Sequence, residues 1–117
     1  MWLGTLYNNI GQNYFEIEQY QNAHRVLVKA LAYRQKEGIS MNIRVAKWTV
    51  AKAEWRLGHV DKTLETLLTL KAEYDLMIEK GNLDLPEELL PQVRGIVYEE
   101  LAKIYQYKMK HFARLAS

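Results

Sequence analysis

The chain has 117 residues and a formal net charge of +2, from 16 Lys and Arg against 14 Asp and Glu. Hydrophobic residues make up 49% of the sequence, which is enough to bury a core and argues against disorder. The charge is too small to indicate nucleic acid or a membrane surface as the partner, and the absence of cysteine excludes disulfides, thiolate catalysis and cysteine metal sites.

The N-terminal residues 1–13 have no basic region, and the amide side chains of Asn8, Asn9 and Gln12 break their apolar residues. This pattern is not that of a signal peptide. No apolar run approaches the ~20 residues that a membrane-spanning helix needs. We therefore expect a cytoplasmic protein with no membrane partner.

Two prolines and six glycines leave few breaks, so a mostly helical chain is expected. The apolar periodicity predicts helices over residues 2–16, 20–37, 41–57, 60–80 and 91–108, and a sixth that begins near Phe112. The first break, at residues 16–19, is a change of phase in the apolar stripe. Three later helices are expected to end at glycines that follow an apolar-periodic run, namely Gly38, Gly58 and Gly81.

Two further residues mark helix starts. Ser40 is expected to cap a helix that opens at Met41. Pro91 is expected to kink or restart the last long helix. Residues 108–112 are expected to form the turn that precedes the sixth helix.

The sequence repeats itself at a spacing of 40 residues. Superposing residues that are 40 positions apart pairs Gly11 with Ala51 and Leu27 with Leu67. Most other pairs also keep the size class of the side chain. Antiparallel helices cross closely where one of them carries Gly or Ala, so Gly11 is expected to lie at a close crossing with Ala23.

The first repeat resembles the tetratricopeptide repeat family, and its long-helix bacterial members in particular. The residues that carry the resemblance are Leu6, Tyr7, Ile10, Gly11, Tyr14, Ala23, Leu27 and Ala30. The resemblance implies an all-α fold, an α-α superhelix of antiparallel helix pairs with about two and a half repeats. The repeats would span residues 2–38, 40–81 and 91–117 of a single domain, 1–117, cut from a larger protein.

In that family the first helix of each repeat lines a concave groove that holds a peptide or a partner helix. The resemblance implies that the groove is lined in this chain by Asn8, Asn9, Gln12, Trp48, Lys52, Arg56 and Lys103. An amide side chain both donates and accepts hydrogen bonds, which suits a peptide backbone. Lys52 and Arg56 are expected to be exposed beside Trp48, which suits an acidic peptide.

A plainer interpretation stands beside this one. The amides of the first helix can be the solvated side of an end helix, and Trp48 can belong to the core between helices. Lys52 and Arg56, four residues apart, form a pair that is common on plain surfaces.

The sequence carries no pattern of catalytic chemistry. His24, His59 and His111 have no His or Glu at metal-ligand spacing, and all six glycines are isolated, so no phosphate loop is present. We expect no enzyme activity, no cofactor and no metal site.

The first hypothesis is therefore a non-catalytic module for protein–protein interaction that holds a peptide or partner helix in its groove. The alternative is a peptide-sensing regulatory domain of a bacterial regulator or signalling protein, as in long-repeat members of the family. An RNA-binding helical repeat is a third hypothesis, against which the small number of clustered cations argues. A homodimer is also expected, because two and a half repeats leave apolar residues at both ends, Phe112 and Leu115 among them.

Overall fold

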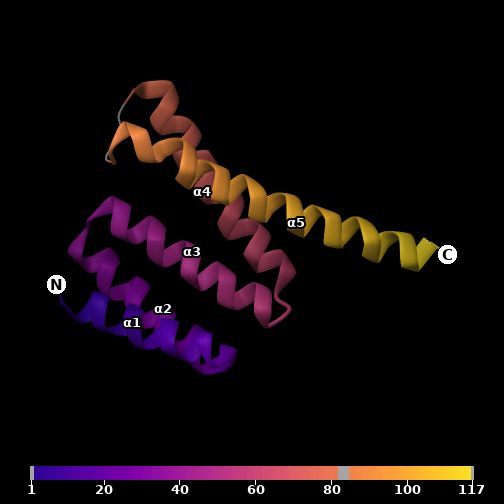
Figure 1. The fold of residues 1–117 in the computed structure, drawn as a ribbon, viewed down its shortest axis with the longest axis horizontal. Coiled ribbons are helices and arrows are strands. Elements are labelled where there is room, and N and C mark those ends of the chain that lie inside the picture. The colour runs from indigo at the N-terminus through magenta and orange to yellow at the C-terminus, as the bar shows by residue number, and fades with distance from the viewer. Residues whose placement is uncertain (1, 82–84, 117) are drawn as a thin grey trace. The chain divides into compact units, whose positions relative to one another are not determined.

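The computed structural model describes residues 2–81 and 85–116. Within these ranges it contains helices and no strand (Figure 1), which confirms the all-α prediction there. The elements are α1 (Trp2–Glu16), α2 (Tyr20–Glu37), α3 (Ser40–Arg56), α4 (Val60–Lys80), the 3-10 helix η1 (Glu87–Leu89) and α5 (Leu90–Ala116). The chain divides into two compact units, Met1–Thr66 and Leu67–Ser117, so the boundary falls within α4. The single-domain expectation stays a prediction.

The predicted boundaries of the first four helices agree with the structure to within one residue. The predicted sixth helix is wrong, because α5 continues without a break from Leu90 to Ala116. Residues 108–112 contain neither Gly nor Pro, so nothing in them stops a helix. The separate second helix of the third repeat is therefore not formed.

The start of α3 differs from expectation, whereas α5 begins within one residue of the restart predicted at Pro91. Ser40 is the first residue of α3 rather than its cap, which is Ile39 and makes no side-chain capping bond. The helix starts one residue early because the Ile43 amide already donates to the Ile39 carbonyl, at 3.0 Å. Pro91 is the second residue of α5, in the first turn, where proline's missing N–H costs nothing.

The three glycines predicted to end helices all have left-handed backbones, with φ of 78° at Gly38, 83° at Gly58 and 64° at Gly81. Such a conformation ends a helix and is cheapest for glycine. The turn after α1 uses the same conformation at Glu18, which has φ of 62°. An L residue with a side chain is strained there.

The turn between α1 and α2 and the turn between α3 and α4 share one hydrogen-bond pattern, displaced by 40 residues. The Gln19 amide donates to the Tyr14 carbonyl at 2.9 Å, and the His59 amide donates to the Glu54 carbonyl at 2.9 Å. Glu18 in the first turn takes the place that Gly58 takes in the second. The backbone of these two turns thus repeats with the spacing that the sequence indicated.

Helix α1 packs closely against α2. Gly11 is buried, and a Cβ atom built on it would lie 2.5 Å from Leu27 Cδ2 and 2.6 Å from Leu27 Cγ. The close crossing predicted at Gly11 is confirmed, but Leu27 rather than Ala23 supplies its three nearest atoms. A second buried glycine, Gly4, lies one heptad earlier against Arg34 Cγ, at 2.9 Å from the added Cβ.

The core of the first unit lies where α2 meets α3. A buried cluster joins residues of the two helices, with larger side chains of α1 and α2 packed against it. Its buried members are Ala23, Leu27, Val50 and Ala53, and the packed neighbours are Tyr14, Phe15 and Leu31. Because two of the four buried residues are alanine, the helices of this unit can approach closely.

The second unit consists of the end of α4, η1 and α5. Its buried apolar residues follow helical spacing on both helices and comprise Leu67, Leu70, Tyr74, Val97, Leu101 and Ile104. Beyond Ile104, large apolar side chains of α5 are exposed, with Met109 72% and Phe112 67% accessible. Among the described residues, no helix combines the length and the hydropathy needed to cross a membrane.

Candidate functional site

The first unit carries a cluster of cations and aromatic rings that we term the basic–aromatic cluster. It consists of Phe15 at the end of α1, Tyr20 at the start of α2, and Trp48, Lys52 and Arg56 on α3. Lys52 Nζ lies 4.4 Å from the centre of the Trp48 ring and 4.9 Å from that of Phe15. Arg56 Cζ lies 5.7 Å from the ring centres of both Phe15 and Tyr20. Both cations thus lie within the range of favourable cation–π contact.

Local structure explains why these five side chains meet. Trp48, Lys52 and Arg56 are spaced by four residues, so they follow one another on one face of α3. Phe15 and Tyr20 flank the tight turn between α1 and α2, and their rings meet edge to face with centres 5.2 Å apart. The turn between them contains Glu18, whose backbone is left-handed.

The two cations differ in their exposure. Lys52 is half-buried, which corrects the expectation that it is exposed, and its ammonium group lies over the rings of Trp48 and Phe15. Arg56 is exposed, as expected. Within residues 2–81 and 85–116, no carboxylate forms an ion pair with Arg56 and no acceptor takes a hydrogen bond from it. Its guanidinium therefore presents unused donors beside an aromatic surface.

The amides predicted for the groove lie on α1. Asn9 is exposed, whereas Asn8 and Gln12 are half-buried. Two polar atoms of predicted groove residues, Asn8 Oδ1 and Trp48 Nε1, are buried without a hydrogen-bond partner among the described residues. Buried polar atoms of this kind are uncommon in folded proteins, so both are notable at predicted site positions.

Lys103, the last predicted groove residue, belongs to the second unit. Its ammonium contacts two carboxylates of its own helix, Glu100 Oε1 at 3.2 Å and Glu99 Oε1 at 3.9 Å. All three side chains lie on α5. The charge of Lys103 is thus balanced locally, unlike that of Arg56.

Sequence reasoning missed Phe15 and Tyr20 as site residues. A superposition of residues 40 positions apart pairs them with Trp55 and Val60, and this keeps the size class without indicating a site. The available signal was that aromatic residues stand on both sides of a predicted turn. Such a turn reverses the chain and brings the two rings together.

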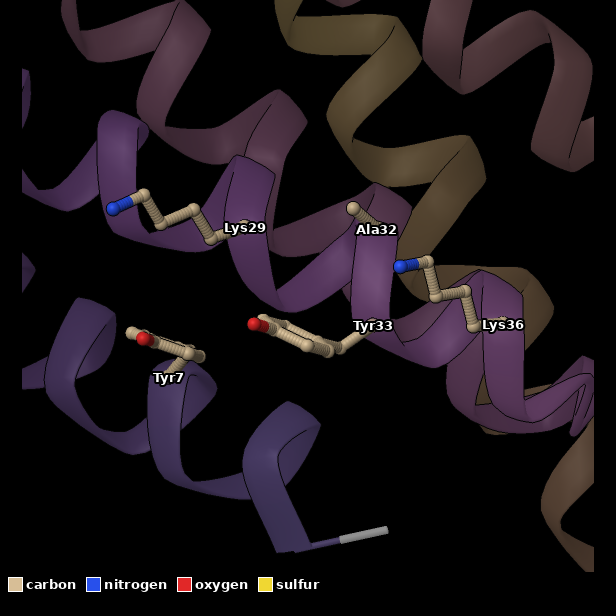
Figure 2. A pocket seen from close by; sticks show the side chains of 5 residues that line it. All are labelled: Tyr7, Lys29, Ala32, Tyr33 and Lys36. Atoms are coloured by element: carbon tan, nitrogen blue, oxygen red, sulfur yellow. The ribbon is translucent and has the colours of Figure 1, made fainter.

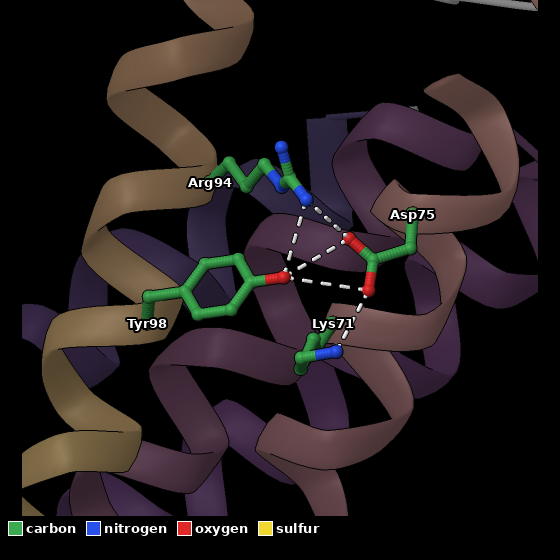
Figure 3. A network of polar contacts seen from close by, with 4 residues as sticks. All are labelled: Lys71, Asp75, Arg94 and Tyr98. Carbon is green, nitrogen blue, oxygen red and sulfur yellow. Dashed lines mark hydrogen bonds and ion pairs between the residues drawn. The ribbon is translucent and has the colours of Figure 1, made fainter. Parts of the chain in front are cut away.

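A second polar cluster, in the second unit, ties α4 to α5 and is shown in Figure 3. Asp75 accepts hydrogen bonds from Lys71 Nζ at 2.8 Å and from Arg94 Nη2 at 3.0 Å. The Tyr98 hydroxyl donates to Asp75 Oδ1 at 3.2 Å and accepts a bond from Arg94 Nη2, also at 3.2 Å. The hydrogen bond from Lys71 lowers the pKa of Asp75 below its ordinary value, and the hydrogen bond from Tyr98 lowers it further. Burial of the carboxylate acts in the opposite direction.

The three histidines each contact other side chains. His24 Nε2 is 3.7 Å from Glu54 Oε2, and the His24 and His59 rings meet edge to face at 6.5 Å. His111 stacks on Tyr107 of the same helix, with ring centres 6.4 Å apart. In the described part of the chain, no three His, Asp or Glu side chains are placed to hold a metal ion.

Comparisons with known proteins found no relative of this chain. No protein-family model matches the chain, and searches of curated proteins and of solved structures return no significant match.

Proposed function

We propose that this chain is a non-catalytic helical interaction module that binds an acidic peptide at the basic–aromatic cluster. The observation that carries the proposal is the exposed guanidinium of Arg56, which lies 5.7 Å from two aromatic ring centres and has no carboxylate partner in the described chain. Three members of the cluster, Trp48, Lys52 and Arg56, are positions that the tetratricopeptide resemblance assigns to the groove.

The chemistry of the cluster favours a carboxylate next to an apolar side chain. Arg56 can form a bidentate pair with a carboxylate, and Lys52 adds a second positive charge one helical turn away. The exposed parts of the aromatic rings can contact an apolar neighbour in the peptide. One bidentate charge-assisted contact stabilises a complex by about 1.5–3 kcal/mol, or roughly 10- to 150-fold in affinity.

Two observations support a tetratricopeptide-like superhelix as the frame of this module. The turns after α1 and α3 repeat their hydrogen bonds at a spacing of 40 residues. Buried positions recur at the same spacing, with Ala23 0% and Thr63 2% accessible, and Leu27 1% and Leu67 2% accessible. Both patterns are expected when one helix pair stacks on the next.

A binding titration tests the proposed function. The probe is a short fluorescent peptide rich in glutamate and leucine, and a lysine-rich peptide of equal length serves as the reference ligand. We expect the acidic peptide to bind and Arg56→Glu to weaken it at least tenfold, because the substitution replaces attraction by repulsion. Circular dichroism should be unchanged, since Arg56 is exposed.

The matched control is Lys62→Glu, which makes the same charge change at an exposed residue of α4 outside the cluster. If Lys62→Glu lowers the affinity for the acidic peptide as much as Arg56→Glu does, binding depends on net charge alone and the assignment of the site is wrong. Equal binding of the acidic and basic peptides contradicts the proposal in the same way.

A further inference from the structure

A pocket separate from the basic–aromatic cluster lies between α1 and α2, with a volume of about 300 Å³. Figure 2 shows the side chains that line it, Tyr7 of α1 and Lys29, Ala32, Tyr33 and Lys36 of α2. None of these residues belongs to the basic–aromatic cluster. The volume is at the lower end of the range of small-molecule sites, so the pocket suits a ligand with one ring or of similar size.

The aromatic wall of the pocket is a stacked pair. The rings of Tyr7 and Tyr33 are 7° from parallel, and their centres lie 5.4 Å apart. Within the described residues, neither hydroxyl makes a hydrogen bond to the protein. Each hydroxyl can therefore donate a hydrogen bond to a ligand.

Two ammonium groups flank this pair. Lys29 Nζ lies 6.0 Å from the centre of the Tyr7 ring, and Lys36 Nζ lies 5.9 Å from that of Tyr33. Both lysines are exposed, and no carboxylate of residues 2–81 or 85–116 forms an ion pair with either of them. Their separation of seven positions places their Cα atoms about 10 Å apart along α2, a distance that two flexible lysine stems can span from both sides.

We propose that this pocket binds an aromatic phosphate monoester, with the phosphate between Lys29 and Lys36 and the ring against the tyrosine pair. A phosphate monoester carries about −1.5 to −2 charge at pH 7, which matches the two unneutralised ammonium groups. Its oxygens accept hydrogen bonds from both ammonium groups and from the tyrosine hydroxyls. A monovalent carboxylate would leave one of the two positive charges unbalanced.

The ring of the ligand is selected by the aromatic wall. Aromatic rings attract one another in offset-stacked or edge-to-face arrangements, beyond the contribution of the area they bury. Ala32 adds a small side chain to the lining, which leaves room for a ring beside the tyrosines. An aryl phosphate should therefore bind more tightly than inorganic phosphate.

The test uses the full chain labelled with ¹⁵N and titrated with phenyl phosphate, with inorganic phosphate and phenol as separate reference ligands. We expect phenyl phosphate to shift the amide signals of Lys29, Tyr33 and Lys36 and to bind more tightly than either reference. Phosphotyrosine and phosphoserine, titrated afterwards, distinguish an aromatic phosphate on a peptide from an aliphatic one. The proposal requires phosphotyrosine to bind more tightly.

Three variants connect the binding to the pocket. Replacing both pocket lysines, Lys29→Gln and Lys36→Gln, should weaken phenyl phosphate at least about tenfold, because both charge-assisted contacts are lost. Tyr33→Phe keeps the stacked ring, removes one donor and should weaken binding by a few-fold. Lys62→Gln removes an exposed lysine elsewhere in the first unit and should leave the affinity unchanged.

Four further results would overturn the proposal. They are the absence of shifts at the pocket amides, phenol binding as tightly as phenyl phosphate, inorganic phosphate binding as tightly as phenyl phosphate, and Lys62→Gln weakening the ligand as much as the double variant. The Arg56→Glu variant changes the basic–aromatic cluster and leaves the pocket intact. Loss of peptide binding at the cluster and loss of phosphate binding at the pocket are therefore separate outcomes.

Discussion

The two compact units of this chain are held together by different means. In the first unit α1 and α2 cross at buried glycines, and alanines lie in the core between α2 and α3, so backbones approach closely. In the second unit a stripe of larger apolar residues is supplemented by the half-exposed network around Asp75. Close packing depends on the size of single residues, whereas a half-exposed ion-pair network contributes little and is sensitive to pH and salt. We therefore expect substitutions of small residues in the first unit to have the larger effects.

The largest effect is expected at Gly11. Gly11→Leu should lower the free energy of unfolding by about 1–3 kcal/mol, because even a Cβ atom would lie 2.5 Å from Leu27 Cδ2 in a packed core. The gain in helix propensity from removing glycine is only about 1 kcal/mol and does not offset this. Urea denaturation of the full chain measures the change.

Gly95 in α5 is the matched control, because a Cβ atom there meets no atom within 4 Å. Gly95→Ala should raise stability by up to about 1 kcal/mol through helix propensity alone. A Gly11→Leu variant that is more stable than the parent would contradict the close crossing in the first unit.

The next effect concerns self-association through the second unit. Tyr105, Met109 and Phe112 follow helical spacing on α5 and are 46%, 72% and 67% exposed. We propose that this face pairs with its copy in a homodimer at micromolar concentration, since pairing would cover these exposed apolar side chains. Replacing Met109 and Phe112 by Glu should weaken the dimer about tenfold or more.

Light scattering over a concentration series measures this association. Ile17→Glu, which alters an apolar residue of the first unit that is 62% exposed, should leave the dimer unchanged. A parent chain that remains a 13.8 kDa species at every concentration would show that the face on α5 does not pair.

A smaller effect is expected at the turn between α1 and α2. Glu18→Gly should stabilise the chain by about 0.5–1 kcal/mol, because glycine adopts the left-handed backbone at φ of 62° without strain. Gly58→Glu makes the opposite change 40 residues later, where a Cβ atom has open space, and should destabilise by a similar amount. Thermal melts that change in the same direction for both variants would show that the two turns are not equivalent.

The smallest effect is expected from the network of the second unit. The pKa of Asp75 is lowered in the folded chain, so its contribution is present above the unfolded pKa of about 3.9 and is lost as the pH falls through the lower folded value. The Tm of the parent should therefore fall more than that of Asp75→Asn when the pH is lowered from about 5 to about 2.5.

Glu79→Gln is the control for this titration, because it changes an exposed carboxylate on the same helix. Its Tm should follow the parent over the whole pH range. If Asp75→Asn loses as much Tm on acidification as the parent, the network around Asp75 does not stabilise the second unit.

The sequence predicted the helices well where local signals are strong. Glycines in left-handed turns end three helices because no other residue adopts that backbone as cheaply, and Gly11 indicated a close crossing because only a small residue fits there. The sixth helix was predicted from apolar periodicity, although residues 108–112 carry no helix-breaking residue. Local chemistry, rather than this periodicity, determined the outcome at α5.

The candidate site was predicted only in part. Helical spacing was sufficient to place Trp48, Lys52 and Arg56 on one face of α3. The neighbours from α1 and α2, Phe15 and Tyr20, depend on how three helices meet, which single-helix periodicity does not encode. The Asp75 network was not predicted for the same reason, because Asp75 and Arg94 are 19 residues apart on different helices.

An NMR titration of the full ¹⁵N-labelled chain with the glutamate-rich peptide tests most directly the claim that the first unit binds ligands at the basic–aromatic cluster. The Trp48 indole N–H, buried without a hydrogen-bond partner in residues 2–81 and 85–116, is the central reporter, and a Trp48→Phe variant assigns its signal. We predict that this signal and the amides of Phe15, Tyr20, Lys52 and Arg56 shift together and saturate at one affinity. Shifts that are confined to residues 67–116, or that leave the Trp48 indole signal unmoved at saturation, would contradict the account.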